Sequence, residues 1–191
     1  MKRKKLDNKI LLHICCAPDS TAATEYLREK GFRVIGYYYN PNMDSTEEDI
    51  KRFKETEKVA GLMNFELYGD YGDIKDRELW SGKITGLEDL DEGGTRCFIC
   101  FRFRLEKTAE KARELGLNRF TTTLTVSPHK NATLINLIGN KIAADYGLEF
   151  YDTNFKKKNG FIKSLEYSRK LNLYRQNYCG CIFSKNKDKN E

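Results

Sequence analysis

The six cysteines of this 191-residue chain fall into close pairs, and this spacing is the strongest chemical signal in the sequence. The pairs are Cys15 with Cys16, Cys97 with Cys100, and Cys179 with Cys181. In a chain without a secretion signal, paired thiols more often indicate metal or redox chemistry than structural disulfides. Four thiolates suffice for zinc or for a cubane iron–sulfur cluster. Six therefore favour a cluster with two spare thiols, or a cluster beside a second metal.

Each pair also has a simpler explanation. Cys15 and Cys16 are small enough to be ordinary core residues, and a single CxxC is also typical of a redox dithiol or of half a zinc site. The third pair is too short for a relaxed disulfide, whereas Gly180 between its cysteines lets both sulfurs turn toward one metal. If the first strand persists through Cys16, the adjacent thiols point to opposite sides and serve two neighbouring centres.

The CxxC pair opens a predicted helix directly after a polar, glycine-rich loop, residues 86–94. Backbone N–H groups and the helix dipole favour thiolate over thiol at such a position. Three arginines lie close by in the sequence and add positive charge: Arg96, Arg102 and Arg104. This environment suits an anionic cluster or a polyanionic substrate.

Hydrophobic periodicity and turn residues predict an α/β fold. The predicted strands are residues 9–16, 32–39, 64–68, 119–125 and 148–152. The predicted helices are residues 20–30, 45–63, 74–80, 97–115, 131–146 and 161–171. Alternating strands and helices indicate right-handed crossovers and a mostly parallel sheet with helices on both faces. Ligands of such sheets bind beyond the carboxyl ends of the strands, where Cys15 lies.

Composition predicts one compact domain, residues 1–184, followed by a flexible charged tail, residues 185–191. Lys and Arg number 34 against 28 Asp and Glu, and the resulting net charge of +6 favours a polyanionic partner such as RNA. An equally simple explanation is a lysine-rich solvated surface. No apolar run approaches the length of about 20 residues that spans a membrane. We therefore expect a cytoplasmic protein without a membrane partner.

Five separated blocks of the sequence resemble the QueH family of epoxyqueuosine reductases. They are LLHICCAPDS (11–20), YYYNPN (37–42), RCFICFRFRL (96–105), FTTTLTVSPHK (120–130) and YRQNYCGC (174–181). The resemblance implies a Rossmann-like fold of the HUP class, which includes the PP-loop ATP pyrophosphatases. It also implies a cobalamin-independent oxidoreductase that completes queuosine synthesis by reducing epoxyqueuosine at the wobble position of tRNA. A [4Fe-4S] cluster with an adjacent metal, iron, and an unidentified electron donor complete the expected system.

On this resemblance we assign roles to individual residues. Cluster ligands are expected to be Cys16, Cys97, Cys100 and Cys179. The adjacent iron is expected to share the rest of the set, Cys15, Cys181 and Asp19, and the division between the two centres stays open. Asp19 stands where we expect the family to have a cysteine; it is either an oxygen ligand or only the N-cap of a helix that begins at Ser20.

The other expected site residues handle protons and RNA. Candidate catalytic residues besides Asp19 are His129 and Tyr178, with metal-bound water as another proton source. Candidate phosphate contacts are Arg96, Arg102, Arg104, Lys156, Lys157, Lys158 and Arg175.

Two other functions remain open. One is a PP-loop, iron–sulfur-dependent tRNA-modifying enzyme such as a thiolase, because residues 15–20 occupy the place of its phosphate-binding loop. The absence of loop glycines and of an N–H at Pro18 disfavours ATP there. The other is a non-catalytic, zinc-stabilised RNA-binding protein.

Overall fold

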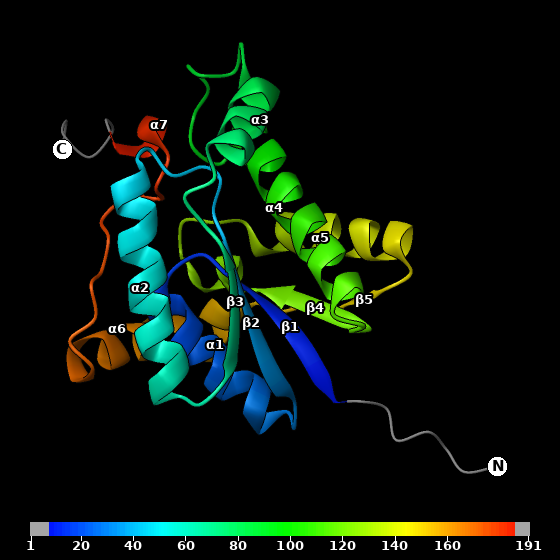
Figure 1. Cartoon of the computed structure of the whole chain (residues 1–191), viewed down its shortest axis with the longest axis vertical. Helices are drawn as coiled ribbons and strands as arrows, with labels where there is room; N and C mark the ends of the chain where they lie inside the picture. Colours follow the sequence, from blue (N-terminus) through cyan, green and yellow to red (C-terminus); the bar gives the residue numbers. More distant parts are fainter. Residues whose placement is uncertain (1–7, 186–191) are drawn as a thin grey trace.

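The computed structural model describes residues 8–185, except for the side chain of Lys158, and shows one five-stranded parallel sheet (Figure 1). Its strands are β1 (Lys9–Ile14), β2 (Arg33–Tyr39), β3 (Glu66–Asp70), β4 (Arg119–Thr122) and β5 (Glu149–Phe150). Their spatial order is β3-β2-β1-β4-β5, and every pairing is parallel. The predicted Rossmann-like α/β fold is confirmed.

The strand order reverses at the centre of the sheet. The chain builds β2 and β3 on one side of β1, then returns to build β4 and β5 on its other side. β1 pairs with both neighbours, so that His13 faces Tyr37 on one side and Thr122 on the other. The crevice beyond β1 and β4 is therefore the expected ligand site of this topology.

Helices cover both faces of the sheet, and each face has its own apolar core. The long helices are α1 (Ala17–Glu29), α2 (Thr46–Leu62), α3 (Ile74–Ile84), α4 (Thr95–Glu114), α5 (Ala132–Tyr146) and α6 (Gly160–Lys170). Short helical turns are η1 (Thr123–Val126), η2 (Phe155–Lys158) and α7 (Ile182–Lys185). α1 packs between α2 and α6, whereas α4 packs on α5 and α3.

The tyrosine run in β2 shows how the sheet separates these cores. Tyr37 and Tyr39 stack on each other, with ring centroids 5.8 Å apart, in the core under α4 and α5. Tyr38 points to the opposite face and packs edge-on against Phe53 of α2. Alternation along the strand therefore places neighbouring tyrosines of this run in different cores.

Two predicted strands end early, and both ends lie at the crevice. β1 stops at Ile14, and α1 begins at Ala17 rather than at Ser20, because Pro18 fits the first helical turn, where no N–H is needed. β4 stops at Thr122, whose hydroxyl accepts a hydrogen bond from the Leu124 N–H and starts the turn η1. The predictions of strand through Cys16 and through residue 125 were wrong.

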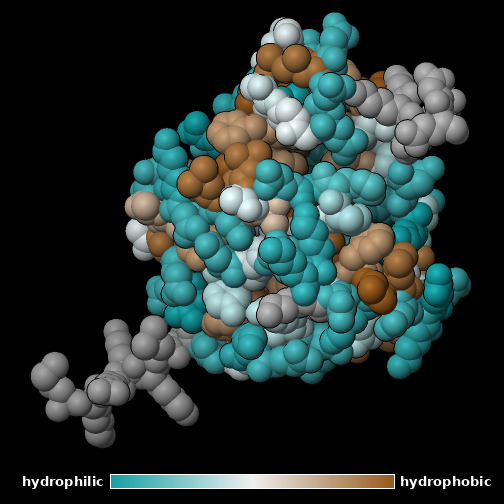
Figure 2. Space-filling model, turned by 180° about the vertical axis from the view of Figure 1, so that it is seen from behind, coloured by the Kyte–Doolittle hydropathy of each residue, from teal (hydrophilic) through white to brown (hydrophobic). Residues whose placement is uncertain are grey.

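The surface and the chain end complete the description. The face shown in Figure 2 is largely hydrophilic, with scattered apolar patches. Lys185, assigned to the tail from sequence, ends α7 and pairs with Asp44 at 2.8 Å, while residues 186–191 lie outside the described part. Within residues 8–185, no helix has the length and apolarity to cross a membrane.

Candidate metal centre and substrate pocket

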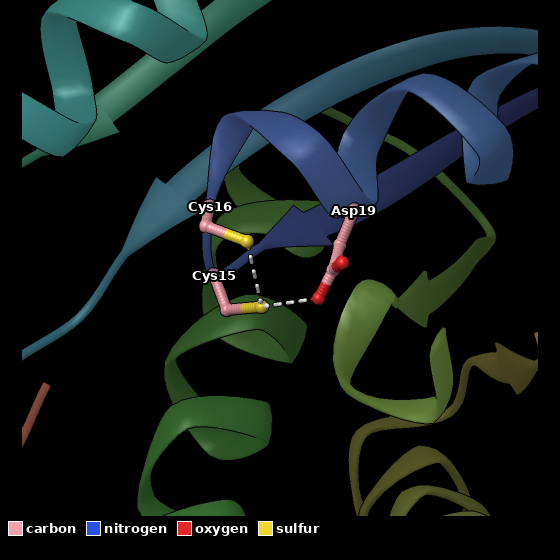
Figure 3. A group of neighbouring side chains, drawn as sticks. All are labelled: Cys15, Cys16 and Asp19. Carbon is pink, nitrogen blue, oxygen red and sulfur yellow. Dashed lines mark hydrogen bonds between the residues drawn. The ribbon is translucent and has the colours of Figure 1, made fainter. Parts of the chain in front are cut away.

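Three ligand-bearing side chains meet where β1 turns into α1 (Figure 3). Ligand atoms of Cys15, Cys16 and Asp19 all lie within 4.8 Å of one another. The Cys15 sulfur is 4.0 Å from the Cys16 sulfur and 3.8 Å from a carboxylate oxygen of Asp19. Because the strand ends before Cys15, the two thiols lie together instead of pointing apart as strand alternation predicted. We call this set the strand-end group.

The first residue of η1, directly after β4, supports the strand-end group. The Thr123 hydroxyl donates to the Cys15 sulfur at 3.1 Å and accepts from the Cys15 N–H at 3.1 Å. The hydrogen bond to Cys16 and the hydroxyl of Thr123 hold the pKa of Cys15 well below its usual range, although burial opposes this. The same contact with Cys15, together with burial, raises the pKa of Cys16. The hydrogen bond between the two sulfurs therefore favours the loss of one proton from the pair over the loss of both.

Asp19 is a buried acid and does not cap a helix. The N-cap of α1 is Cys16, and Asp19 lies inside the first helical turn with 8% of its surface exposed. Burial and the neighbouring Cys15 raise the pKa of Asp19 to about 7. The N-cap interpretation was wrong, and a buried carboxyl without a positively charged hydrogen-bond partner is suited to binding a cation.

The other four cysteines surround a second cavity. Cys97 and Cys100 come from the first turns of α4, and Cys179 and Cys181 come from the segment before α7. We call them the four-cysteine group. All six cysteines of the chain lie in the described part and are free thiols.

Burial sets the protonation of this second group. The Gly93 N–H donates to the Cys97 sulfur at 3.2 Å, as expected at a helix start. Burial nevertheless outweighs this contact and raises the pKa of Cys97, and it raises that of Cys100 to about 12. The helix start favours the thiolate as expected, but burial has the larger effect on Cys97. Such thiols lose their protons when a metal binds.

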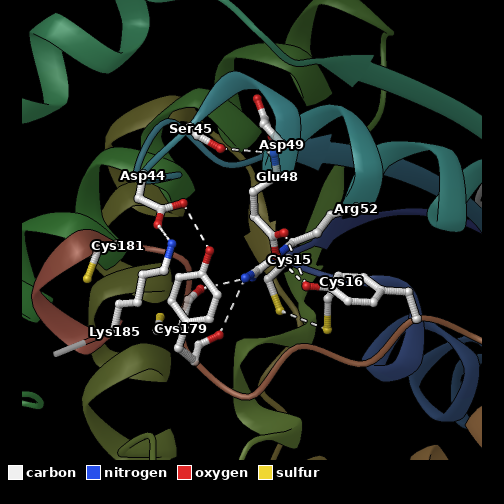
Figure 4. A network of polar contacts seen from close by, with 12 residues as sticks. Cys15, Cys16, Asp44, Ser45, Glu48, Asp49, Arg52, Cys179, Cys181 and Lys185 are labelled. Carbon is white, nitrogen blue, oxygen red and sulfur yellow. Dashed lines mark hydrogen bonds and ion pairs between the residues drawn. The ribbon is translucent and has the colours of Figure 1, made fainter. Parts of the chain in front are cut away.

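Polar contacts hold the backbone of the CGC segment in place (Figure 4). The buried guanidinium of Arg52, from α2, donates to the Cys179 carbonyl at 3.1 Å and pairs with Glu48 at 2.7 Å. The Asp44 N–H donates to the Gly180 carbonyl at 2.8 Å. Gly180 has φ of +117°, and a Cβ there would lie 2.5 Å from Met43. The expectation that glycine lets both sulfurs face one cavity fits this geometry.

The grouping of ligands differs from the one expected from sequence. Cys16 belongs with Cys15 and Asp19, whereas Cys181 joins the other three cysteines at the second cavity. Four thiols match the ligand set of a cubane cluster, and two thiols with a carboxylate match a site for one metal with an open position. Both sets fit the expected groups.

A larger pocket of about 320 Å³ opens beside the strand-end group. The pocket is lined by Cys15, Pro18 and Asp19, by the loop after η1 and by the segment before Cys179. This pocket and the four-cysteine cavity share part of their lining: Glu92, His129, Lys130 and Cys179. The two ligand groups therefore meet at one substrate-sized space.

Lys130 is the principal residue that sequence reasoning missed. Burial lowers the pKa of Lys130, but the nearby Cys179 and Cys15 outweigh this and raise it, so the ammonium stays charged. Lys156, predicted as a phosphate contact, donates to the Lys130 carbonyl at 2.6 Å and steadies this loop. The sequence signal for this residue is its place directly after His129, at the end of the block FTTTLTVSPHK.

The predicted RNA contacts divide by burial. Arg96 and Arg104 are 2% and 1% exposed, so neither meets an RNA backbone on the open surface, contrary to expectation. Arg96 donates to the Glu88 carbonyl at 2.6 Å, and Arg104 donates to Asn40. Through these hydrogen bonds the two guanidinium groups fix loops around the site.

The remaining cations lie nearer the surface. Arg102 is exposed and pairs with Glu106, while Arg175 lines the pocket with its guanidinium over Phe161. Lys157 is exposed, and the side chain of Lys158 lies outside the described part.

Both predicted proton-handling residues line the pocket. His129 is exposed on the loop after η1. Its backbone N–H donates a hydrogen bond to the Ser127 hydroxyl at 3.3 Å. The Tyr178 hydroxyl donates to Asp44 at 2.9 Å, and burial together with this contact raises its pKa. Tyr178 is therefore a weaker acid than an ordinary tyrosine, and its hydroxyl proton is already used in the hydrogen bond to Asp44.

Fold and site together define a Rossmann-like α/β protein with a thiol-rich site at the switch point of its sheet. A family model described as epoxyqueuosine reductase QueH matches residues 10–187. The protein of that name from Thermotoga maritima is 40% identical over 92% of this chain and 89% of its own length. Its counterpart from Streptococcus pyogenes serotype M1 is 36% identical over 96% of this chain and 72% of its own length. The chain belongs to the QueH family of epoxyqueuosine reductases.

Proposed function

We propose that this protein reduces the epoxide of epoxyqueuosine in tRNA to the alkene of queuosine, without cobalamin, in the cytoplasm. In this reaction both carbon–oxygen bonds of the epoxide break and a carbon–carbon double bond forms. Two electrons and two protons enter, and the oxygen leaves as water. The observation that carries the proposal is the meeting of two distinct ligand groups at one substrate-sized pocket.

The two groups support different cofactors. The four-cysteine group would hold a [4Fe-4S] cluster, and the strand-end group would hold one iron. When bound, the cluster would supply electrons one at a time and the iron would bind the epoxide oxygen as a Lewis acid. Cys179 borders both cavities and lies at their junction.

The chain's own residues would orient the substrate and manage charge. Lys130 lines the pocket, and its ammonium would stabilise the negative charge that develops on the departing oxygen. His129, on the same wall, is the more available proton source, because the Tyr178 hydroxyl is committed to Asp44. Arg175 at the pocket and the exposed Lys157 would contact phosphates of the anticodon loop.

The direct test is incubation of anaerobically loaded protein with a reductant and tRNA that carries epoxyqueuosine, without added cobalamin. We expect nucleoside mass spectrometry to show the loss of one oxygen atom, and no loss with the Cys97→Ala variant. An unchanged nucleoside mass with fully loaded wild-type protein would remove the reductase assignment. The physiological electron donor is then found by replacing the chemical reductant with candidate redox proteins.

Metal analysis separates the reductase from a zinc-stabilised RNA-binding protein. We expect iron and acid-labile sulfide with brown absorbance. Zinc at one per chain without sulfide would favour the binding protein instead. The structure does not favour the ATP-dependent alternative. Pro18 lies in the first turn of α1, where phosphate binding needs free N–H groups, and proline has none.

A further inference from the structure

Three buried side chains with unused hydrogen-bond donors line the cavity of the four-cysteine group. They are Asn42, in the turn after β2, Trp80 of α3 and Arg96 of α4. Each is at most 6% exposed, and all three line the cavity that the cysteines surround. The three come from separate elements, so the fold itself brings them together.

These donors have no partner among the described protein atoms. The Trp80 Nε1, the Asn42 amide and one Arg96 nitrogen lack hydrogen bonds, although Arg96 donates through its other terminal nitrogen to Glu88. Ten buried side-chain atoms in residues 8–185 are without a partner, and four of them belong to these three residues: three donor nitrogens and the acceptor oxygen of Asn42. Buried polar groups are nearly always paired, so this concentration around one cavity indicates an acceptor that binds there.

Sulfur is the acceptor at hand. Cys97 already receives the Gly93 N–H, and Cys181 lies 3.5 Å from the Ser184 hydroxyl. Cys100 is buried, with 7% of its surface exposed, and lines the same cavity as Trp80. Its sulfur is therefore the candidate acceptor for the indole N–H.

We propose that Trp80 donates a hydrogen bond to the Cys100 sulfur once a cluster is bound, and that Asn42 and Arg96 donate to other cluster sulfurs. This inference rests on the cluster of the proposed function. Reduction adds negative charge that spreads over the sulfurs, so donors stabilise the reduced form more than the oxidised form. These positioning residues thereby raise the reduction potential of the cluster and ease its reduction by the electron donor.

Trp80 is the only tryptophan of the chain, which permits a test in two directions. Trp80→Phe keeps a buried aromatic ring but removes the N–H, and the reduction potential should fall. Growth on a fluorinated tryptophan changes position 80 alone and makes its N–H more acidic, and the potential should rise. Reductive titration of loaded protein, followed by visible absorption and electron paramagnetic resonance, measures both shifts.

A matched control removes buried aromatic area without removing a donor. Phe103 packs beside Lys83 of α3, and Phe103→Leu should leave the potential unchanged even where stability falls. Asn42→Leu should lower the potential, and its effect should add to that of Trp80→Phe. If both tryptophan replacements leave the potential at the wild-type value, or shift it in the same direction, the proposal is wrong.

Cluster loading is measured separately from its potential. Trp80 borders the cavity, so its fluorescence should be quenched when iron and sulfide are incorporated, which gives a readout independent of activity. Wild-type protein that binds no sulfide contradicts the proposed function. Wild-type and Trp80→Phe proteins that load equally but share one potential contradict only the donor role.

Discussion

The two ligand groups of this protein are assembled in opposite ways. The strand-end group lies within a stretch of five residues, 15–19, and combines sulfur with oxygen ligand atoms. It opens onto a pocket of about 320 Å³. The four-cysteine group joins two segments about eighty residues apart, contains only sulfur, and is surrounded by buried donors without partners. An open position suits substrate chemistry, whereas an enclosed, all-sulfur environment suits electron storage.

The largest expected effect separates the two groups by metal content. Cys97→Ala should lose all acid-labile sulfide and the charge-transfer absorption, because a cubane cluster depends on about four thiolates. Cys16→Ala should retain sulfide and absorption and lose roughly one iron. Analysis of iron and sulfide on anaerobically prepared protein measures both. Loss of sulfide in Cys16→Ala would show that the division into two groups is wrong.

The buried acid of the strand-end group predicts a pH effect in metal-free protein. Because the folded-state pKa of Asp19 is raised to about 7, the native state binds a proton that the unfolded chain releases, and stability falls as pH rises from about 4 to 7. Asp19→Asn mimics the protonated acid and should be more stable than wild type at pH 8, by roughly 2 to 4 kcal/mol. Denaturant unfolding at pH 8 and at pH 4 measures this, and the advantage should vanish at pH 4.

Iron binding should reverse the order of stability of wild type and Asp19→Asn. Iron binding stabilises only a native state that offers its ligands, so loaded wild type should exceed loaded Asp19→Asn. An Asp19→Asn variant that gains as much from iron as wild type would demote Asp19 from the ligand set. Sulfide content should stay at the wild-type level in this variant.

The junction between the groups is tested through Lys130. Lys130→Met removes a charge that borders both cavities, and kcat/KM should fall roughly tenfold to a hundredfold, as expected for a lost contact to a charged group. Lys157→Met, at an exposed position of η2, is the matched control and should change little at moderate salt. Equal losses in both variants would indicate general RNA attraction instead of a role at the junction.

The smallest effect concerns the backbone of the four-cysteine group. Gly180→Ala should destabilise the protein by about 1 to 2 kcal/mol, because φ of +117° and the contact with Met43 disfavour a Cβ. Gly61→Ala, in α2 with open space around it, should stabilise by about 0.5 to 1 kcal/mol. Thermal unfolding measures both, and a neutral Gly180→Ala would mean that the CGC segment adapts freely.

Local sequence determined most of the fold and one of the two groups. The alternation of strands and helices specified the parallel sheet, since apolar periodicity and turn residues act over a few positions. Cys15, Cys16 and Asp19 could be predicted as one candidate group because all three follow a single strand. Their mutual geometry could not be predicted, since Thr123 of η1, over one hundred residues away in the chain, holds the N–H and the sulfur of Cys15.

Tertiary structure decided the rest, because its contacts join residues that no sequence window contains. Burial turned Arg96 and Arg104 from expected RNA contacts into internal supports. The approach of the CGC segment to α4, held by Arg52 of α2, placed Cys181 with the four-cysteine group and left Cys16 with Asp19. The sequence by itself singled out six thiols and one carboxylate as candidate ligands; only the packing of the helices and the CGC segment onto the sheet divided them into two spatial groups.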